Sequence, residues 1–205
     1  MEIERIFYPV RTLGPGMRLG IWTVGCAFRC FNCCNEELQE ANPDKEVPLS
    51  TLFDMIDSIE HPIDGVTISG GDPFFQVEEL VPLVKGLVDR GIEDILIYTG
   101  NTLKQLREMN NMHVNFVLDN IAVLIDGIYI EALNDNSPLR GSFNQQVHIF
   151  KEKYREKYEA FLKGERQLQT LVYDQSLLAI GIPPKGYKKD LHEKAKEKGI
   201  AFREY

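Results

Sequence analysis

The sequence predicts an α/β protein organised around a parallel sheet. Short runs of β-branched and other apolar residues alternate along the chain with longer stretches whose apolar residues recur at helical spacing. Turn sequences rich in glycine and proline separate the two kinds of segment. This rhythm is typical of right-handed βαβ units. A length of 205 residues suits one domain, alone or with an appendage, and is enough to bury a core.

The predicted strands are short and mostly apolar. Before the first predicted strand, residues 11–16 read Arg-Thr-Leu-Gly-Pro-Gly, a turn signature that breaks any regular element. The run at 121–125 is nearly all apolar, as expected of a strand covered on both faces. The strands expected in the first part of the chain are 19–24, 66–69, 95–98, 121–125 and, as a candidate for the last, 147–150.

The predicted helices fill the intervals between these strands. Apolar residues at helical spacing indicate helices over 52–59 and 77–89, and a short one that contains Leu103, Leu106 and Met109. Ser50 is the expected N-cap of the first helix. Pro82 interrupts the second, which therefore begins near it or kinks, and Gly91 is its natural end.

The pattern changes after residue 150. A charged helix is expected over 151–163, followed by a β-hairpin from 168–173 and 176–182, a lysine-rich helix at about 188–198 and an edge strand at 200–202. We therefore expect two parts, a barrel-like unit over 1–150 and an appendage over 151–205 that packs on it.

Composition and charge narrow the class of function. The net charge of −8 argues against a protein that binds nucleic acid. Neither a signal peptide nor an apolar run of membrane-spanning length is present, and clustered thiols need reducing conditions, so we expect a cytoplasmic protein without a membrane partner. Residues 1–150 carry 10 Lys and Arg against 22 Asp and Glu, whereas residues 151–205 carry 13 against 9. The basic segment is either a solvated helix face or a docking surface.

All four cysteines of the chain lie in one loop after the first predicted strand, and Cys26, Cys30 and Cys33 have the spacing C-x3-C-x2-C. A disulfide framework spreads its cysteines along the chain, whereas crowded thiols indicate a metal site. Structural zinc sites bring ligands in two separated pairs, and the sequence has no second pair. Iron–sulfur clusters normally use four thiolates. Three well-spaced cysteines therefore suggest a 4Fe-4S cluster with one iron left open, with Cys34 as a neighbouring thiol.

Polar loops follow the other predicted strands, where sites of parallel α/β folds collect. Taken alone, each is an ordinary turn, helix cap or surface loop. The histidines at 61, 113, 148 and 192 show no ligand spacing, and no role is assigned to them. The loops are Ser69-Gly70-Gly71-Asp72-Pro73, Tyr98-Thr99-Gly100-Asn101, Asp126-Gly127 and Arg140-Gly141-Ser142-Phe143-Asn144-Gln145.

The cysteine loop and these four loops together resemble the radical S-adenosylmethionine (SAM) superfamily. The stretch from Leu124 to Gln145 is most similar to the activases of glycyl-radical enzymes, in the branch that activates anaerobic ribonucleotide reductase. The resemblance covers about residues 5–150 and weakens beyond them. It implies an incomplete (β/α) barrel of the radical SAM type with an α+β appendage at its C-terminal end.

The resemblance also implies a reaction and its residues. A 4Fe-4S cluster on Cys26, Cys30 and Cys33 would cleave SAM reductively to a 5′-deoxyadenosyl radical, which would generate a glycyl radical on a partner enzyme. A small electron donor such as flavodoxin or ferredoxin would supply the electron. Asn32 departs from the family, which often has an aromatic residue there. The SAM-binding residues carried over are Asn32, Cys34, Ser69, Gly70, Gly71, Asp72, Thr99, Asp126, Ser142 and Asn144.

Two other functions remain open from the sequence. One is a small radical SAM enzyme that modifies a free metabolite or a peptide. The other is a non-catalytic iron–sulfur or zinc module, which would not need the Gly-Gly-Asp and Arg-Gly-Ser-x-Asn-Gln loops.

Overall fold

The computed structural model describes residues 1–173 and 176–199, so the edge strand expected at 200–202 lies outside the described residues. Its centre is a six-stranded sheet in which the strands follow one another in chain order. Sequential strands joined by right-handed crossovers place their helices on one face, which is the arrangement of a barrel. The incomplete barrel expected from the sequence is confirmed. The strands are β1 (Ile3–Val10), β2 (Arg18–Thr23), β3 (Gly65–Gly70), β4 (Ile95–Tyr98), β5 (Val123–Asp126) and β6 (Gln146–Ile149).

The two edges of the sheet differ from the prediction of a parallel sheet. Strands β2 to β5 are parallel, but β1 and β6 each run antiparallel to their neighbour. Strand β1 lies in residues for which no strand is expected from the sequence, just before the turn at 11–16. Parallel neighbours need a crossover connection, whereas antiparallel ones need only a turn or a loop. The short link from β1 to β2 and the loop 127–145 from β5 to β6, which contains no α-helix, meet only the second requirement.

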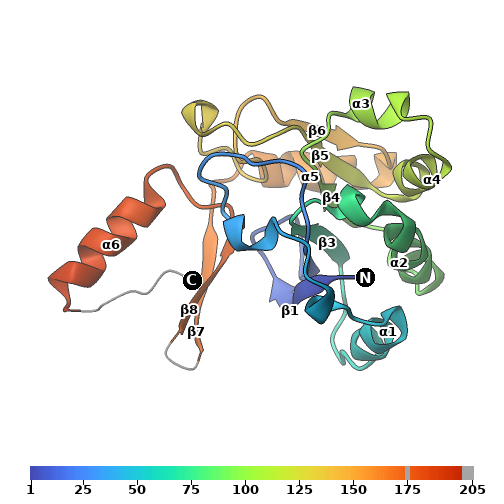
Figure 1. The fold of residues 1–205 in the computed structure, drawn as a ribbon, viewed down its shortest axis with the longest axis horizontal. Helices are drawn as coiled ribbons and strands as arrows, with labels where there is room; N and C mark the ends of the chain where they lie inside the picture. Colours follow the sequence, from blue (N-terminus) through green and yellow to red (C-terminus); the bar gives the residue numbers. More distant parts are fainter. Residues whose placement is uncertain (174–175, 200–205) are drawn as a thin grey trace.

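Helices cover the outer face of the barrel (Figure 1): α1 (Leu49–Asp57), α2 (Val77–Asp89), α3 (Leu103–Glu108) and α4 (Met112–Asn120). Helix α2 has the predicted bounds and contains Pro82 in its interior, and Gly91 follows its end with φ of +77°. The prediction of Ser50 as an N-cap is wrong, because α1 begins at Leu49 with Pro48 in the cap position. Helix α4 is not predicted from the sequence, although it has a capping residue: Asn111 accepts hydrogen bonds from two backbone amides of the first turn. Short 3₁₀ helices span Glu36–Leu38, Pro43–Lys45, Pro73–Gln76, Glu131–Leu133 and Glu152–Tyr154.

The sheet is buried on both faces, which explains its nearly continuous apolar strands. Along β4, Ile95 and Ile97 pack with the outer helices, whereas Leu96 joins a second cluster on the inner face. That inner cluster also holds Tyr158 of α5 (Arg155–Leu162). Successive residues of a strand point to opposite faces, so both faces must be apolar when both are covered.

The C-terminal segment adds a separate two-stranded sheet of β7 (Leu168–Tyr173) and β8 (Ser176–Gly181), and the predicted hairpin is confirmed. Helix α6 (Tyr187–Glu197) follows it, and in Figure 1 α6 stands apart from the barrel, beyond the hairpin. The hairpin lies on the side of the sheet opposite to α1 and α2 (Figure 1). None of the helices in the described part of the chain combines the length and the apolar character that crossing a bilayer requires.

A buried ionic network lies at the amino ends of β2 and β4. Arg18 of β2 is fully buried and donates to Asp94 at 3.0 Å and to Thr67 at 2.7 Å. Asp94 is itself buried and accepts a hydrogen bond of 2.7 Å from the hydroxyl of Tyr158. Lys157 lies 2.5 Å from the same carboxylate. The network therefore joins β2, β3 and the start of β4 to α5.

Candidate functional site

The cysteine loop lies between the carboxyl ends of β2 and β3. Its first residues are held on two sides by the backbone: Gly25 and Cys26 donate to the carbonyls of Leu38 and Gln39, each at 2.9 Å. On the other side the amide of Asp72 donates to the carbonyl of Gly25 at 2.8 Å. The loop is thus anchored at its base, while the cysteines themselves extend beyond the sheet.

The double glycine after β3 is required by this close approach. A Cβ atom on Gly71 would lie 2.3 Å from the carbonyl oxygen of Gly25, and one on Gly70 would lie equally close to the carbonyl oxygen of Thr23. Gly70 also has φ of +108°, a backbone conformation that favours glycine. The neighbouring Ser69 is half-buried, and its carbonyl accepts from the hydroxyl of Thr23. The Gly-Gly pair therefore lets β3 carry the next loop directly against the cysteine loop.

Asp72 joins the ends of β3 and β4. Its buried carboxylate accepts from the hydroxyl of Thr99 at 3.0 Å and from the amide of Gly100 at 3.0 Å, and it caps the following 3₁₀ helix through the amide of Phe74. Burial raises the pKa of Asp72, and these hydrogen bonds oppose that rise. The ring of Phe28 fills the space above Gly100, where a Cβ atom would lie 2.4 Å from it. These contacts bring two predicted site residues, Asp72 and Thr99, together beside the cysteine loop.

The four thiols occupy different environments. All are free, and Cys26, Cys30 and Cys33 are half-buried. Burial raises the pKa of Cys26 to about 11 and also raises that of Cys30, where the backbone of Tyr129 opposes the rise. A hydrogen bond between the Cys33 and Cys34 side chains lowers the pKa of Cys33 and raises that of Cys34. Cys34 therefore lies beside a predicted ligand as a hydrogen-bond donor.

The backbone conformation at position 32 explains why asparagine stands where the family often has an aromatic residue. It is exposed and has φ of +54°, in the left-handed region that asparagine tolerates better than aromatic residues. The cysteine loop makes a left-handed turn at this residue, immediately before Cys33.

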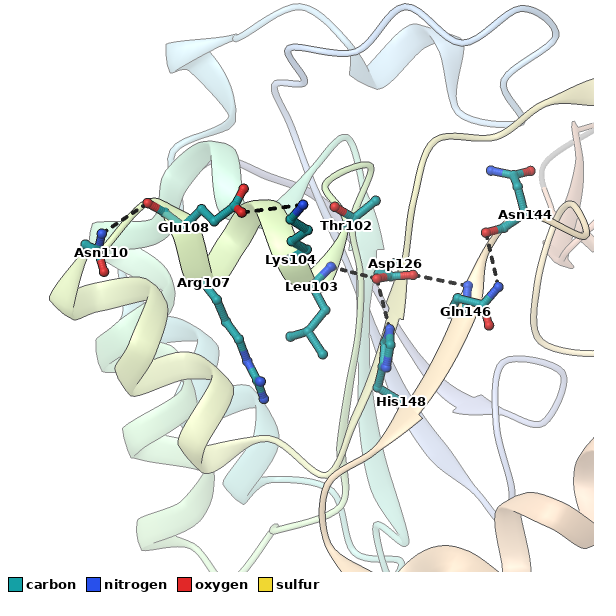
Figure 2. Close-up of a pocket in the computed structure, with 10 residues that line it drawn as sticks. All are labelled: Thr102, Leu103, Lys104, Arg107, Glu108, Asn110, Asp126, Asn144, Gln146 and His148. Carbon is teal, nitrogen blue, oxygen red and sulfur yellow. Dashed lines mark hydrogen bonds and ion pairs between the residues drawn. The ribbon is translucent and has the colours of Figure 1, made fainter.

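Asp126 lies at the end of β5 and holds three segments together (Figure 2). Its carboxylate accepts from the amide of Leu103 at 2.6 Å and from the amide of Gln146 at 3.1 Å, and it lies 2.9 Å from Nε2 of His148. No role is predicted for His148 from the sequence, because only the antiparallel pairing of β6 with β5 brings its side chain within hydrogen-bond distance of Asp126. These residues line a cleft of about 730 Å³ between α3 and β6, together with Asn144 and Arg107.

The loop 127–145 is fixed by its own polar side chains. The hydroxyl of Ser142 donates to Asn144 at 2.8 Å, and Asn144 donates to the carbonyl of Ile128 at 2.8 Å. Gln145, which sequence analysis does not single out, accepts from the amides of Gly141 and Ser142 and donates to the carbonyl of Gly127. These bonds tie the loop to itself, and the backbone of Tyr129 is hydrogen-bonded to the thiol of Cys30.

The structure therefore places the predicted residues in two groups. Ser69, Gly70, Gly71, Asp72 and Thr99 lie around the base of the cysteine loop, and Asp126, Ser142 and Asn144 lie around the loop 127–145. Asn101 links the groups: it donates to Thr99 through its amide at 3.1 Å and accepts from the amide of Gly127 at 2.9 Å. The side chain of Asp126 points to α3 and β6 rather than to Asp72.

The donor set fits a cluster better than a single ion. A zinc ion bonds each sulfur at about 2.3 Å, so its ligand sulfurs must gather around one point. Within the described residues, no three side chains of His, Cys, Asp or Glu are gathered closely enough to hold one metal ion. A cubane places each thiolate on a different iron, which suits three thiols spread over one loop.

Comparisons with known proteins identify a matching family and several relatives. Residues 12–148 match the family described as 4Fe-4S single cluster domain. The anaerobic ribonucleoside-triphosphate reductase-activating protein of Salmonella typhimurium is 33% identical over 153 residues, which cover 69% of this chain and 95% of that protein. The protein of the same name from Escherichia coli is 31% identical over 150 residues, with the same coverage.

Two more distant similarities were found. The pyruvate formate-lyase-activating enzyme of Staphylococcus epidermidis is 27% identical over 146 residues, or 67% of this chain and 56% of that protein. The crystal structure of QueE from Escherichia coli aligns with a TM-score of 0.40 and 23% identity over 49% of this chain and 52% of that chain.

The family match spans all three cysteines of the motif and every predicted cofactor-binding residue, and the first relatives are matched over nearly their whole length. The chain therefore belongs to the 4Fe-4S single cluster domain family as a radical SAM activating enzyme, an oxidoreductase that uses a 4Fe-4S cluster and SAM.

Proposed function

We propose that this protein generates a glycyl radical on a partner enzyme, and that the partner is an anaerobic ribonucleoside-triphosphate reductase. The names of the relatives that match this chain over 95% of their own length support this partner. A reducing cytoplasm, where clustered thiols persist, is the compartment that suits the proposal.

The observation that favours a protein substrate over a free metabolite is the set of exposed apolar side chains on the cysteine loop and on the loop 127–145. Phe31 is 77% exposed on the cysteine loop, and Phe143 is 64% exposed on the loop 127–145, where the backbone of Tyr129 is hydrogen-bonded to the thiol of Cys30. Ile128 and Leu133 of the second loop are also exposed. Exposed apolar side chains that gather beside a site are typical of protein interaction surfaces.

The chain's residues have distinct parts in this proposal. Cys26, Cys30 and Cys33 would hold the cluster as thiolates, and Cys34 would remain a non-ligand thiol. When bound, the cluster supplies one electron for the reductive cleavage of SAM. Electrons would come from a small carrier such as flavodoxin or ferredoxin. We further propose that residues 1–150 form the catalytic unit and 151–205 the appendage, with α5 packed into the core of that unit.

The SAM-binding residues would act mainly by shape and hydrogen bonding. Gly70 and Gly71 let the loop after β3 lie directly against the cysteine loop, and Asp72 and Thr99 would fix the ends of β3 and β4 beside it. Asn32, Cys34, Ser69, Ser142 and Asn144 complete the set at the two loops. Asp126 would act through the segments that it holds, since its carboxylate accepts from the amides of Leu103 and Gln146 and lies beside His148.

The test combines the reconstituted enzyme with an anaerobic ribonucleoside-triphosphate reductase from the same organism. With SAM and a strong reductant under anaerobic conditions, the reductase should develop the doublet of a glycyl radical in its electron paramagnetic resonance spectrum. The control is a Cys30→Ser activase, which should give no doublet. A protein that cleaves SAM but leaves the reductase without a radical would overturn the proposed partner.

A further inference from the structure

The hairpin β7–β8 and the residues beside it pack along the open side of the barrel. We call residues 165–173 and 176–185 the side wall. Strands β1 and β6 are the two ends of the sheet, so the barrel is open between them. The side wall is attached to segments next to both of these strands.

The first attachment is to the end of β1 and to the residues that follow it. Gln169 donates to the carbonyl of Pro9 at 3.0 Å and accepts from the amide of Arg11 at 3.3 Å. The hydroxyl of Thr12 donates to the carbonyl of Ile180 at 2.9 Å. Both strands of the hairpin are therefore hydrogen-bonded to the β1 side of the opening.

The second attachment is to the loop that precedes β6, and Arg166 makes most of it. Its guanidinium donates to the carbonyl of Ser137 at 2.8 and 3.0 Å, to the side chain of Asn134 at 2.9 Å and to the carbonyl of Arg140. It also donates to the carbonyl of Pro183 at 3.0 Å, just after the end of β8. The cation is half-buried and makes charge-assisted hydrogen bonds, which are stronger than those between neutral groups.

The side wall also covers the inner face of the barrel directly below the cysteine loop. Ile180, Leu171 and Leu178 pack in one cluster with Trp22 of β2 and Tyr98 of β4. Trp22 is only 5% exposed, although it lies on the inner face of the second strand from the edge. It is also the single tryptophan of the chain, so its fluorescence reports on this contact.

We propose that the side wall closes the open side of the barrel, so that substrate reaches the cysteine loop only across the carboxyl ends of the strands, and that Arg166 is a positioning residue that couples the wall to the loop 127–145. The route of the substrate rests on the proposed function, whereas the closure does not. The coupling runs from Arg166 through the carbonyl of Arg140 to Ser142 and Asn144.

The side wall lies beyond the residues that match the family. The family match ends at residue 148, and the enterobacterial relatives are matched over 95% of their length by 69% of this chain. The side wall therefore covers the open side of the barrel with residues that lie outside the family match. A partner that presents its glycine on a protruding loop can still reach the site from above.

The test uses the full-length apoprotein, so it needs neither cluster, SAM nor partner. Arg166→Met and Gln169→Ala each remove one attachment, and Arg155→Met is the matched control, since Arg155 pairs only with Glu152 and Glu159 among the described residues. Acrylamide should quench Trp22 poorly in the wild type and at least roughly threefold better in either wall variant. Hydrogen exchange of amides 134–145 should accelerate at least roughly tenfold in Arg166→Met, because a charged hydrogen bond is worth more than that factor.

Further measurements separate positioning from a general loss of stability. Arg166→Lys keeps the charge with fewer directed donors and should fall between wild type and Arg166→Met. In reconstituted enzyme, Arg166→Met should raise the KM for SAM more than it lowers kcat of partner-free SAM cleavage. Exchange that rises equally throughout the protein would overturn the positioning role, and unchanged quenching of Trp22 in folded Gln169→Ala would overturn the closure. If Arg166→Met does not fold, Arg166→Lys and Gln169→Ala decide both points.

Discussion

Asp94→Asn should destabilise the protein strongly although it changes a single atom far from the cysteine loop. Asp94 is the only carboxylate within ion-pair distance of Arg18 in the described part of the chain, and the two buried side chains lie 3.0 Å apart. Removing one partner of a buried ion pair costs about 3–5 kcal/mol, because the other charge is left in a poorly solvated site. We therefore expect a loss of this size from the free energy of unfolding of the apoprotein, measured by urea denaturation followed by circular dichroism.

Substitutions at the neighbouring groups should change the free energy of unfolding by smaller amounts. Tyr158→Phe removes one hydrogen bond of 2.7 Å to the same carboxylate and should cost about 1.5–3 kcal/mol. The double variant Arg18→Met with Asp94→Leu should recover part of the loss caused by Asp94→Leu alone, because no unpaired charge remains. A typical domain has a free energy of unfolding of only about 5–15 kcal/mol. The urea transitions must therefore be compared at a low temperature, at which the destabilised variants are still folded without urea.

The matched control is Asp57→Asn, which removes an equally short ion pair with Arg90 at 2.8 Å on the surface. Surface pairs are screened by water and add little stability, so this variant should unfold near the wild type. If Asp94→Asn unfolds at the same urea concentration as Asp57→Asn, the buried network does not stabilise the fold in the way inferred here.

The site itself gives three more outcomes. Serine at any cysteine of the C-x3-C-x2-C motif should abolish or degrade the cluster, measured by iron and sulfide content, whereas Cys34→Ser should retain it; a Cys34 variant without a cluster contradicts the ligand assignment. Gly71→Val forces a Cβ atom to within 2.3 Å of a backbone oxygen and should weaken SAM binding in calorimetry. The control is Gly164→Ala, whose Cβ would meet only one carbonyl at 3.2 Å and which should bind SAM like the wild type. Equal SAM affinities of the two variants would show that the Gly-Gly loop is a plain turn. Charge reversal at the exposed Lys189, Lys194 and Lys196 of α6 should slow glycyl-radical formation most at low salt and leave partner-free SAM cleavage unchanged. Equal loss of both activities would instead show that α6 is structural.

The sequence by itself determined the scaffold and the chemistry of the site. Apolar runs and helical spacing are local properties, so β4, α2 and the hairpin β7–β8 are predicted with nearly the observed bounds. The spacing of Cys26, Cys30 and Cys33 is also local, and it is enough to indicate a cluster. The pair Gly70-Gly71 is also visible in the sequence, but the contact that requires glycine at 71, a carbonyl of the cysteine loop 2.3 Å from a Cβ built there, appears only in the folded chain.

The tertiary structure decided what depends on pairing between distant segments. The residues of β1 and β6 do not indicate in which direction each strand runs. Their antiparallel course and the hydrogen bond between His148 and Asp126 therefore could not be predicted. The same holds for Arg166, whose partners lie 17 to 32 residues away along the chain. A single arginine in a polar stretch carries no signal of its own, because its role is set by the carbonyls that folding brings to it.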